Sequence, residues 1–121
     1  MDTLIAIWLT RDATELTAAA RKLITEADEM FVSTASIWEA ATKVTLGKLP
    51  GLPQRFADRL RLADTVPLPV TWDHALAAHS LPALPKDLFD RLRVAQAVSE
   101  PMHLLTHDAA LAAYADLVTV V

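Results

Sequence analysis

The sequence predicts a single α/β domain over residues 1–121, in which a short, mostly parallel sheet is covered by helices on both faces. Short apolar runs that suit strands alternate along the chain with segments of helical periodicity, the pattern of a parallel sheet with crossover helices. The chain has 121 residues, 53% of them hydrophobic, which is enough for one sizeable core. The seven prolines fall between the periodic segments and therefore indicate connections.

The first half of the chain is expected to hold a helix, a strand and a second helix. Residues 14–26 carry apolar side chains at helical spacing with charged side chains between them, which predicts an amphipathic helix. Residues 30–33 form a short apolar run rich in strand formers. This run passes directly into residues 36–46, where helical periodicity returns.

The second half is expected to repeat this alternation. A strand over residues 66–70 contains two prolines, Pro67 and Pro69, and should therefore be very short or lie at an edge. A helix follows over residues 73–79. The remaining predicted elements are a helix over residues 89–99, a strand over 103–106, a short helix over 108–114 and a final strand over 117–121.

Composition excludes several classes of protein. No stretch approaches the roughly 20 apolar residues that a membrane-spanning helix needs, and no secretory signal is visible between Asp2 and Arg11. The absence of cysteine excludes disulfides and fits a cytoplasmic protein. A net charge of −4 argues against a surface that coats polyanions, so any nucleic acid must meet a local basic patch.

Three acidic residues follow predicted strands or open predicted helices. Glu39 and Asp108 come shortly after strands, and Asp90 opens a helix that the same sheet edge can reach. Carboxylates brought together repel one another unless a cation holds them. Magnesium prefers oxygen ligands of this kind and keeps waters that can attack a phosphate. The three acids are therefore candidate metal ligands.

Each acid also has a simpler interpretation. Glu39 could be a solvated glutamate favoured by the dipole near a helix N-terminus. Asp87 and Asp90 have the spacing of an N-cap and a first-turn residue, and Asp108 could cap the helix that it precedes.

Other chemistries have less support in the sequence. His74 and His79 would lie on different faces of one helix, and His103 and His107 span a strand and a turn, so a zinc site is not expected. Gly47 and Gly51 cannot build a phosphate-binding loop or a nucleophile elbow, and no cysteine nucleophile exists.

Two separated motifs of the chain carry a resemblance to a known family. In the first motif, the run Ser36-Ile37-Trp38-Glu39 precedes Lys43-Val44-Thr45-Leu46-Gly47-Lys48-Leu49. This arrangement strongly resembles the central signature of the VapC-type toxin ribonucleases of the PIN-domain family. The second motif, Asp87-Leu88-Phe89-Asp90-Arg91, is similar to the family's Asp-Pro-Phe-Asp-Arg block, and Leu105-Thr106-His107-Asp108 is similar to its closing strand and acid. The order and approximate spacing agree across nearly the whole chain.

The resemblance implies a compact three-layer α/β/α fold, dependence on Mg²⁺ or Mn²⁺, cleavage of RNA, a homodimer and inhibition by an antitoxin protein. It assigns metal binding to Glu39, Asp90 and Asp108, with Asp87 as a helper. Candidates for contact with RNA phosphates are the cationic residues Lys43, Lys48, Arg91 and Arg93, since such side chains bind nucleic-acid backbones, although each could equally be an ordinary solvated charge.

The chain departs from this pattern at its start. The family opens with an apolar strand that delivers an Asp-Thr pair, whereas this chain begins Met1-Asp2-Thr3 with no strand before it. Counting back from Trp8, the expected pair would fall on Met1 and Asp2, one residue out of register. We therefore expect either an upstream start or a truncated relative, with Asp2 as the fourth acid only on a fraying terminus.

Without the first strand, the backbone groups of the strands beside it lack hydrogen-bond partners, which predicts reduced stability or dependence on a partner. Two alternatives to an active enzyme that hydrolyses RNA stay open. The second hypothesis is a catalytically impaired PIN-like module that binds an antitoxin or a dimer partner without cleaving RNA. A third is action on DNA or on structured RNA other than transfer RNA, which the sequence leaves open.

Overall fold

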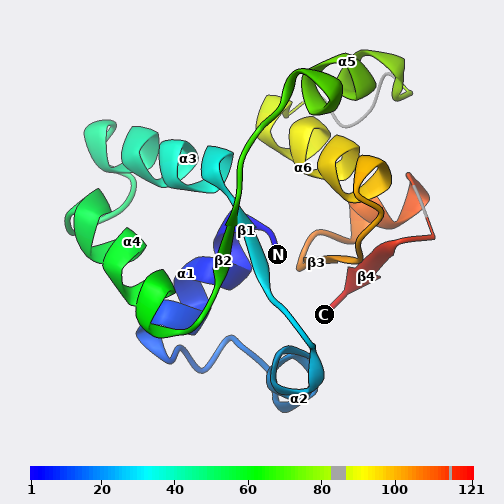
Figure 1. Cartoon of the computed structure of the whole chain (residues 1–121). Coiled ribbons are helices and arrows are strands. Elements are labelled where there is room, and N and C mark those ends of the chain that lie inside the picture. The colour runs from blue at the N-terminus through cyan, green and yellow to red at the C-terminus, as the bar shows by residue number, and fades with distance from the viewer. Residues whose placement is uncertain (83–86, 115) are drawn as a thin grey trace.

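In the computed structural model, which describes residues 1–82, 87–114 and 116–121, short parallel strands are surrounded by helices (Figure 1). The helices are α1 (Thr3–Arg11), α2 (Ala18–Glu26), α3 (Thr34–Thr45), α4 (Pro53–Leu62), α5 (Trp72–Ser80), α6 (Leu88–Ser99) and the 3₁₀ helix η1 (Ala109–Ala113). The strands are β1 (Phe31–Ser33), β2 (Val66–Leu68), β3 (Leu104–Thr106) and β4 (Val118–Val120). The predicted α/β class is confirmed.

The strands form two separate parallel pairs rather than the one sheet that was expected, as far as the described residues go. β1 pairs with β2, with Phe31 opposite Val66, and β3 pairs with β4, with Leu104 opposite Val118. Figure 1 shows the N-terminus between the two pairs. No strand precedes β1 in the part of the chain that is described, as the sequence led us to expect.

Two residues at the N-terminus bridge this division. The Met1 amine donates to the Phe31 carbonyl oxygen on β1 at 3.0 Å, and the Asp2 amide donates to the Leu105 carbonyl oxygen on β3 at 2.9 Å. Consecutive residues that donate to opposite sides in this way are typical of a strand inside a parallel sheet. The bridge is two residues long, so most of the facing edges of β1 and β3 remain apart.

A cavity of about 730 Å³ lies between the two strand pairs. Its lining includes Phe31 of β1, Leu104 and Leu105 of β3, Ile24 of α2 and Arg93 of α6. The lining is mostly apolar, so the space separates surfaces that would otherwise form one core.

The helices form two groups around the strands. α1, α3 and α4 pack against one another on one side of β1 and β2, while α5 and α6 pack together and α6 reaches β3 (Figure 1). The buried apolar residues follow this grouping. One cluster centres on Val94 and Leu104, one on Ile5 and Ala20, and one on Val32 with its neighbours. Helix α3 joins the groups because it contacts both α1 and α6.

Several predicted boundaries were wrong for local reasons. Helix α2 begins at Ala18 because Thr17 caps it, its Oγ1 accepting from the Ala20 amide at 3.2 Å. Helix α3 begins at Thr34, directly after β1, because Ser33 is its N-cap. The short helix expected over residues 108–114 is the 3₁₀ helix η1. The strand expected over 117–121 has only three residues, as β4. The strand over 66–70 was expected to be very short, and this is confirmed, since β2 also has three residues.

Two helices were not among the predicted elements. α1 lies in the N-terminal segment, where only its end was noted, at Trp8, in the resemblance. α4 begins with Pro53 at its first turn, and only Leu60 of its residues is buried. Such a narrow apolar stripe among charged residues gives little periodic signal.

No helix in the described residues has the length and apolar character that crossing a membrane requires.

Candidate functional site

Glu39 lies at the centre of the candidate site, on the buried side of α3. Its side chain is held by Thr3, whose Oγ1 donates to Oε1 at 2.7 Å, and by Arg93, whose Nη1 donates to the same oxygen at 2.7 Å. The Lys43 ammonium lies 3.3 Å from Oε2. Only 9% of Glu39 is exposed, so its interpretation as a solvated glutamate is wrong.

Asp2 reaches the same region from the start of α1. It caps this helix, with Oδ1 accepting from the Ile5 amide at 2.9 Å. Its other oxygen, Oδ2, accepts from Thr106 Oγ1 at 2.5 Å and from the His107 amide at 3.3 Å. Asp2 is 6% exposed, and both of its carboxylate oxygens and its amide are hydrogen-bonded, so the expectation of a fraying terminus was wrong.

Asp90 enters from the first turn of α6, and Asp87 is the N-cap of that helix. Asp87 Oδ1 accepts from the Asp90 amide at 3.0 Å, and Asp87 itself is exposed. The Asp90 carboxylate pairs with Nη2 of Arg93, one turn further along the helix. An edge-to-face contact between Phe89 and Trp38 of α3, with ring centroids 5.3 Å apart, holds the start of α6 near Glu39.

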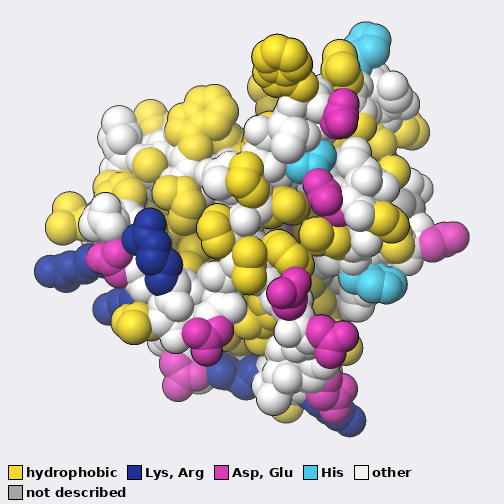
Figure 2. Space-filling model, in the orientation of Figure 1, with side chains coloured by type: hydrophobic (Ala, Val, Ile, Leu, Met, Phe, Trp, Pro, Cys, Tyr) yellow, Lys and Arg dark blue, Asp and Glu magenta, His cyan; other side chains and the backbone are white. Residues whose placement is uncertain are grey.

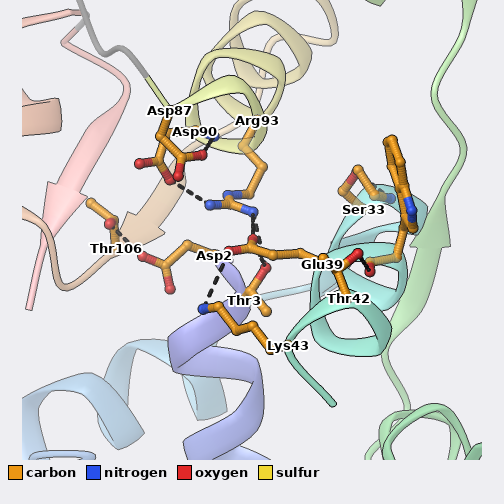
Figure 3. Close-up of polar contacts among 12 residues, drawn as sticks. Asp2, Thr3, Ser33, Glu39, Thr42, Lys43, Asp87, Asp90, Arg93 and Thr106 are labelled. Carbon is orange, nitrogen blue, oxygen red and sulfur yellow. Dashed lines mark hydrogen bonds and ion pairs between the residues drawn. The ribbon is translucent and has the colours of Figure 1, made fainter. Parts of the chain in front are cut away.

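Arg93 stands between these acids. Its guanidinium contacts Glu39 through one terminal nitrogen and Asp90 through the other, and Nη1 also lies 2.9 Å from Thr3 Oγ1 (Figure 3). The residue is 5% exposed. The structure therefore brings two of the predicted acids, Glu39 and Asp90, into contact with one buried cation, and the negative charge of Asp2 acts on the same guanidinium.

Asp108 lies outside this cluster. It is exposed and caps η1, with Oδ1 accepting from the Ala110 amide at 2.9 Å. Its own amide donates to Thr106 Oγ1 at 3.0 Å. Since Thr106 also donates to Asp2, one threonine links Asp108 to the buried acids.

The charges in the cluster shift one another's pKa values. Burial alone would raise the pKa of Glu39, but hydrogen bonds from Thr3 and Arg93 and the positive charges of Arg93 and Lys43 outweigh it and lower the pKa. Burial also raises the pKa of Asp90, and here Arg93 compensates only in part. The pKa of Arg93 is raised despite burial, chiefly by Glu39. The contacts with Arg93 and its neighbours therefore outweigh the cost of burial for Glu39 but not for Asp90.

The four basic residues considered for RNA contact occupy different surroundings. Arg93 is buried among the acids, and Arg91 donates to the carbonyl oxygens of Pro82, Ala78 and Leu81 near the end of α5. Lys43 is half-buried beside Glu39, and Lys48 is exposed after α3. Lys43 and Lys48 are thus better situated than the arginines to meet a phosphate.

The type and convergence of the acids fit a divalent metal, but their arrangement does not yet form its site. Carboxylate oxygens are suitable ligands for Mg²⁺ and Mn²⁺. Among the described residues, however, no three acids or histidines are grouped so that they could hold an ion. The space between Glu39 and Asp90 is instead taken by Arg93.

A comparison with models of known protein families shows to which family the chain belongs. The model of the PIN domain matches residues 1–117, nearly the whole chain. The chain belongs to the PIN-domain family. No curated protein and no solved structure gives a significant match. PIN domains are generally metal-dependent nucleases and often occur in toxin–antitoxin systems.

Sequence reasoning missed two threonines of this PIN domain and misread the arginine. Thr3 and Thr106 are fully buried hydroxyls that orient Glu39 and Asp2. Thr3 is the first residue of α1 and Thr106 is the last residue of β3, and a single threonine at either kind of position carries no signal by itself. Arg93 does carry one, because it lies beside Val94 and Ala97 on the buried part of α6, where a charge requires a partner.

Proposed function

We propose that this PIN domain is an endoribonuclease, the toxin of a type II toxin–antitoxin pair, that hydrolyses RNA phosphodiester bonds with Mg²⁺ or Mn²⁺. The observation that carries the proposal is that Glu39 of α3 and Asp90 of α6 pair with one buried arginine, with the charge of Asp2 at the start of α1 close enough to act on it, in a chain of a nuclease family. Burying several carboxylates near one another is costly, and groups whose pKa values are perturbed in this way are typical of functional sites.

The acids have distinct places in this proposal. Glu39, Asp90 and Asp2 are the ligands nearest to one another, and Asp108 joins them across Thr106. A divalent ion held there would lower the pKa of a bound water and neutralise charge on the phosphate. Lys43 and Lys48 would bind the RNA backbone, and Asp87 remains an N-cap that could assist the ligands only if α6 shifts.

Exposed apolar surface supports the proposed protein partners, an antitoxin and a second copy of the chain. Figure 2 shows apolar side chains gathered on the surface over α3 and α5. On these two helices Trp72 and Leu76 of α5 are 90% and 70% exposed, and Trp38 of α3 is 68% exposed. Large apolar side chains left exposed in a surface patch are typical of a protein interface.

The decisive experiment measures cleavage of RNA by the purified chain. Cleavage should need Mg²⁺ or Mn²⁺, stop with EDTA and fall by about 100-fold or more in Glu39→Gln, since changes beside metal ligands already cost 10–100-fold. Glu26→Gln is the matched control, because Glu26 is an exposed glutamate on α2. Cleavage that survives both EDTA and Glu39→Gln would overturn the proposal, and a DNA substrate assayed in parallel tests the alternative nucleic acid.

A catalytically impaired module is the second candidate, and the position of Arg93 between Glu39 and Asp90 favours it. In that case calorimetric titration with Mn²⁺ should show no saturable binding up to the low millimolar range, and no RNA should be cleaved. The two candidates therefore differ in metal binding as well as in activity.

A further inference from the structure

Arg93 is an unusual residue for the buried part of a helix. Its neighbours Val94, Ala95 and Ala97 are all apolar and buried, whereas Arg93 brings a guanidinium to the same depth. A buried charge is tolerated only where it is paired and hydrogen-bonded. The partners of Arg93 are two carboxylates that belong to different helices, Glu39 of α3 and Asp90 of α6.

We infer that Arg93 is a built-in cation that competes with the divalent metal: it holds Glu39 and Asp90 together in the metal-free protein, and it must leave before one ion can bind both. The inference rests on the proposed metal site and goes beyond it, because it assigns to Arg93 neither metal ligation nor contact with RNA. Arg93 is thus a positioning residue whose departure accompanies metal binding.

The balance of charge supports exchange rather than addition. The count covers the buried and half-buried groups alone, because Asp87 and Asp108 are exposed to solvent, which screens their charge. Asp2, Glu39 and Asp90 carry three formal negative charges, and Lys43 and Arg93 carry two positive ones, which leaves these groups at minus one. A divalent ion beside Arg93 would bring them to plus one in a buried place. Replacement of Arg93 by the ion brings them to zero, and the smaller net charge is the less costly to bury.

An adjacent cavity gives the Arg93 side chain room to move. Arg93 lines the 730 Å³ cavity between the two strand pairs, together with Ser33 and Gln96. Its Nε is buried and has no hydrogen-bond partner among the described residues. A side chain with one unsatisfied donor and an adjacent cavity can change rotamer without displacing the core.

Removal of Arg93 tests the competition directly. Arg93→Met keeps an unbranched apolar stem without the charge, and it should bind Mn²⁺ about tenfold more tightly than the parent chain in calorimetric titration, the lower end of the effect of residues around metal ligands. Without metal, the same variant should melt at a lower temperature, because Glu39 and Asp90 then lack the guanidinium that pairs with both. Saturating Mn²⁺ should raise its melting temperature more than that of the parent.

Arg91→Met is the matched control. It removes the same group from the same helix, but the hydrogen bonds that Arg91 makes within the described residues go to backbone carbonyl oxygens. Its Mn²⁺ affinity should stay within about threefold of the parent, the scale of a distant, screened charge. Equal affinity of the parent and Arg93→Met, or an equal gain in both variants, would overturn the competition.

A measurement on the unaltered chain covers the case in which Arg93→Met does not fold. With ¹⁵N-labelled arginine, the Nη–H resonances of Arg93, which donate to Glu39 and Asp90, should exchange slowly with water in the metal-free protein and rapidly at saturating Mg²⁺. Slow exchange at saturating Mg²⁺ would show that the guanidinium stays in place and would overturn the inference. RNA cleavage is assayed on the same samples. Absence of cleavage bears on the proposed nuclease function, whereas unchanged metal affinity bears on the competition by Arg93, so the two failures are distinguished.

Discussion

At the scale of single residues, two threonine hydroxyls hold the acids in position. Thr106 donates to Asp2 and accepts from the Asp108 amide, and Thr3 donates to Glu39. Each hydroxyl is buried, so its partners cannot turn to water if it is lost. The geometry of the site thus depends on side chains that carry no charge.

Replacement of Thr106 by valine should destabilise the chain by about 1–3 kcal/mol, because the isosteric change leaves the Asp2 carboxylate and the Asp108 amide each short of a buried partner. Urea unfolding monitored by circular dichroism measures this difference. Thr42→Val is the control, since Thr42 donates only to the Trp38 carbonyl oxygen of its own helix. Similar losses in the two variants would contradict a special role for Thr106.

The sequence indicated the acids at this scale but not their environments. Glu39 shares a helical face with Lys43, which suggested a solvated position, yet α1 and α6 cover it. That cover comes from Thr3 and Arg93, which lie 36 and 54 residues away along the chain. Periodicity within one helix cannot report contacts of such long range.

At the scale of elements, caps decide where the site helices begin. Asp2, Ser33 and Asp87 are the N-caps of α1, α3 and α6, and each stands within a few residues of the candidate site. The capping interpretation of Asp87 and Asp108 agrees with their hydrogen bonds. Asp2 can cap α1 and also belong to the candidate site, because each role uses a different carboxylate oxygen. Oδ1 accepts from the Ile5 amide, and Oδ2 accepts from Thr106.

Asp87 offers a test that separates a cap from a metal ligand. Asn caps helices as well as Asp does, so Asp87→Asn should keep the stability of the chain within a few tenths of a kcal/mol, whereas Asp87→Ala should lose about 1 kcal/mol. The Mn²⁺ affinity should change little in either variant. A marked loss of Mn²⁺ affinity in Asp87→Asn, with stability intact, would instead identify Asp87 as a ligand.

At the scale of the whole molecule, sequence pattern predicted the parallel strands but not their division into two pairs. The apolar runs that became β1 and β3 are visible in the sequence, whereas pairing depends on what lies between them. In the part of the chain that the structure describes, Met1 donates to β1 and Asp2 donates to β3, and these two residues alone bridge the strands. Helix α4 was missed for a related reason, because its partners α1 and α3, rather than its own periodicity, stabilise it.

The buried Met1 amine should make the stability of the 121-residue chain depend on pH. Burial lowers its pKa from 8.0 to about 6, so between these values the unfolded chain binds more protons than the folded one. The free energy of unfolding should therefore rise from pH 6 to pH 8, by at most about 3 kcal/mol for a difference of two units. Urea unfolding across this window measures the slope, and an N-terminally acetylated chain should lack this contribution. An equal slope in both chains would contradict it.

The cavity between the strand pairs makes a stronger prediction about stability. An engineered extension of about five apolar residues before Met1, such as Ile-Val-Leu-Leu-Val, is long enough for a typical strand. It would continue the alternating bonds that Met1 and Asp2 already make to β1 and β3, and its side chains would enter the apolar cavity. The melting temperature should rise by about 5 °C or more, which corresponds to roughly 1 kcal/mol in a chain of this size.

A Ser-Gly-Ser-Gly-Ser extension is the matched control, because it also removes the charged amine from Met1 but brings no apolar side chains. If the two extensions raise the melting temperature equally, the gain comes from the amine alone; a larger gain from the apolar extension shows that β1 and β3 accept a strand between them and that the divided sheet limits the stability of this PIN domain.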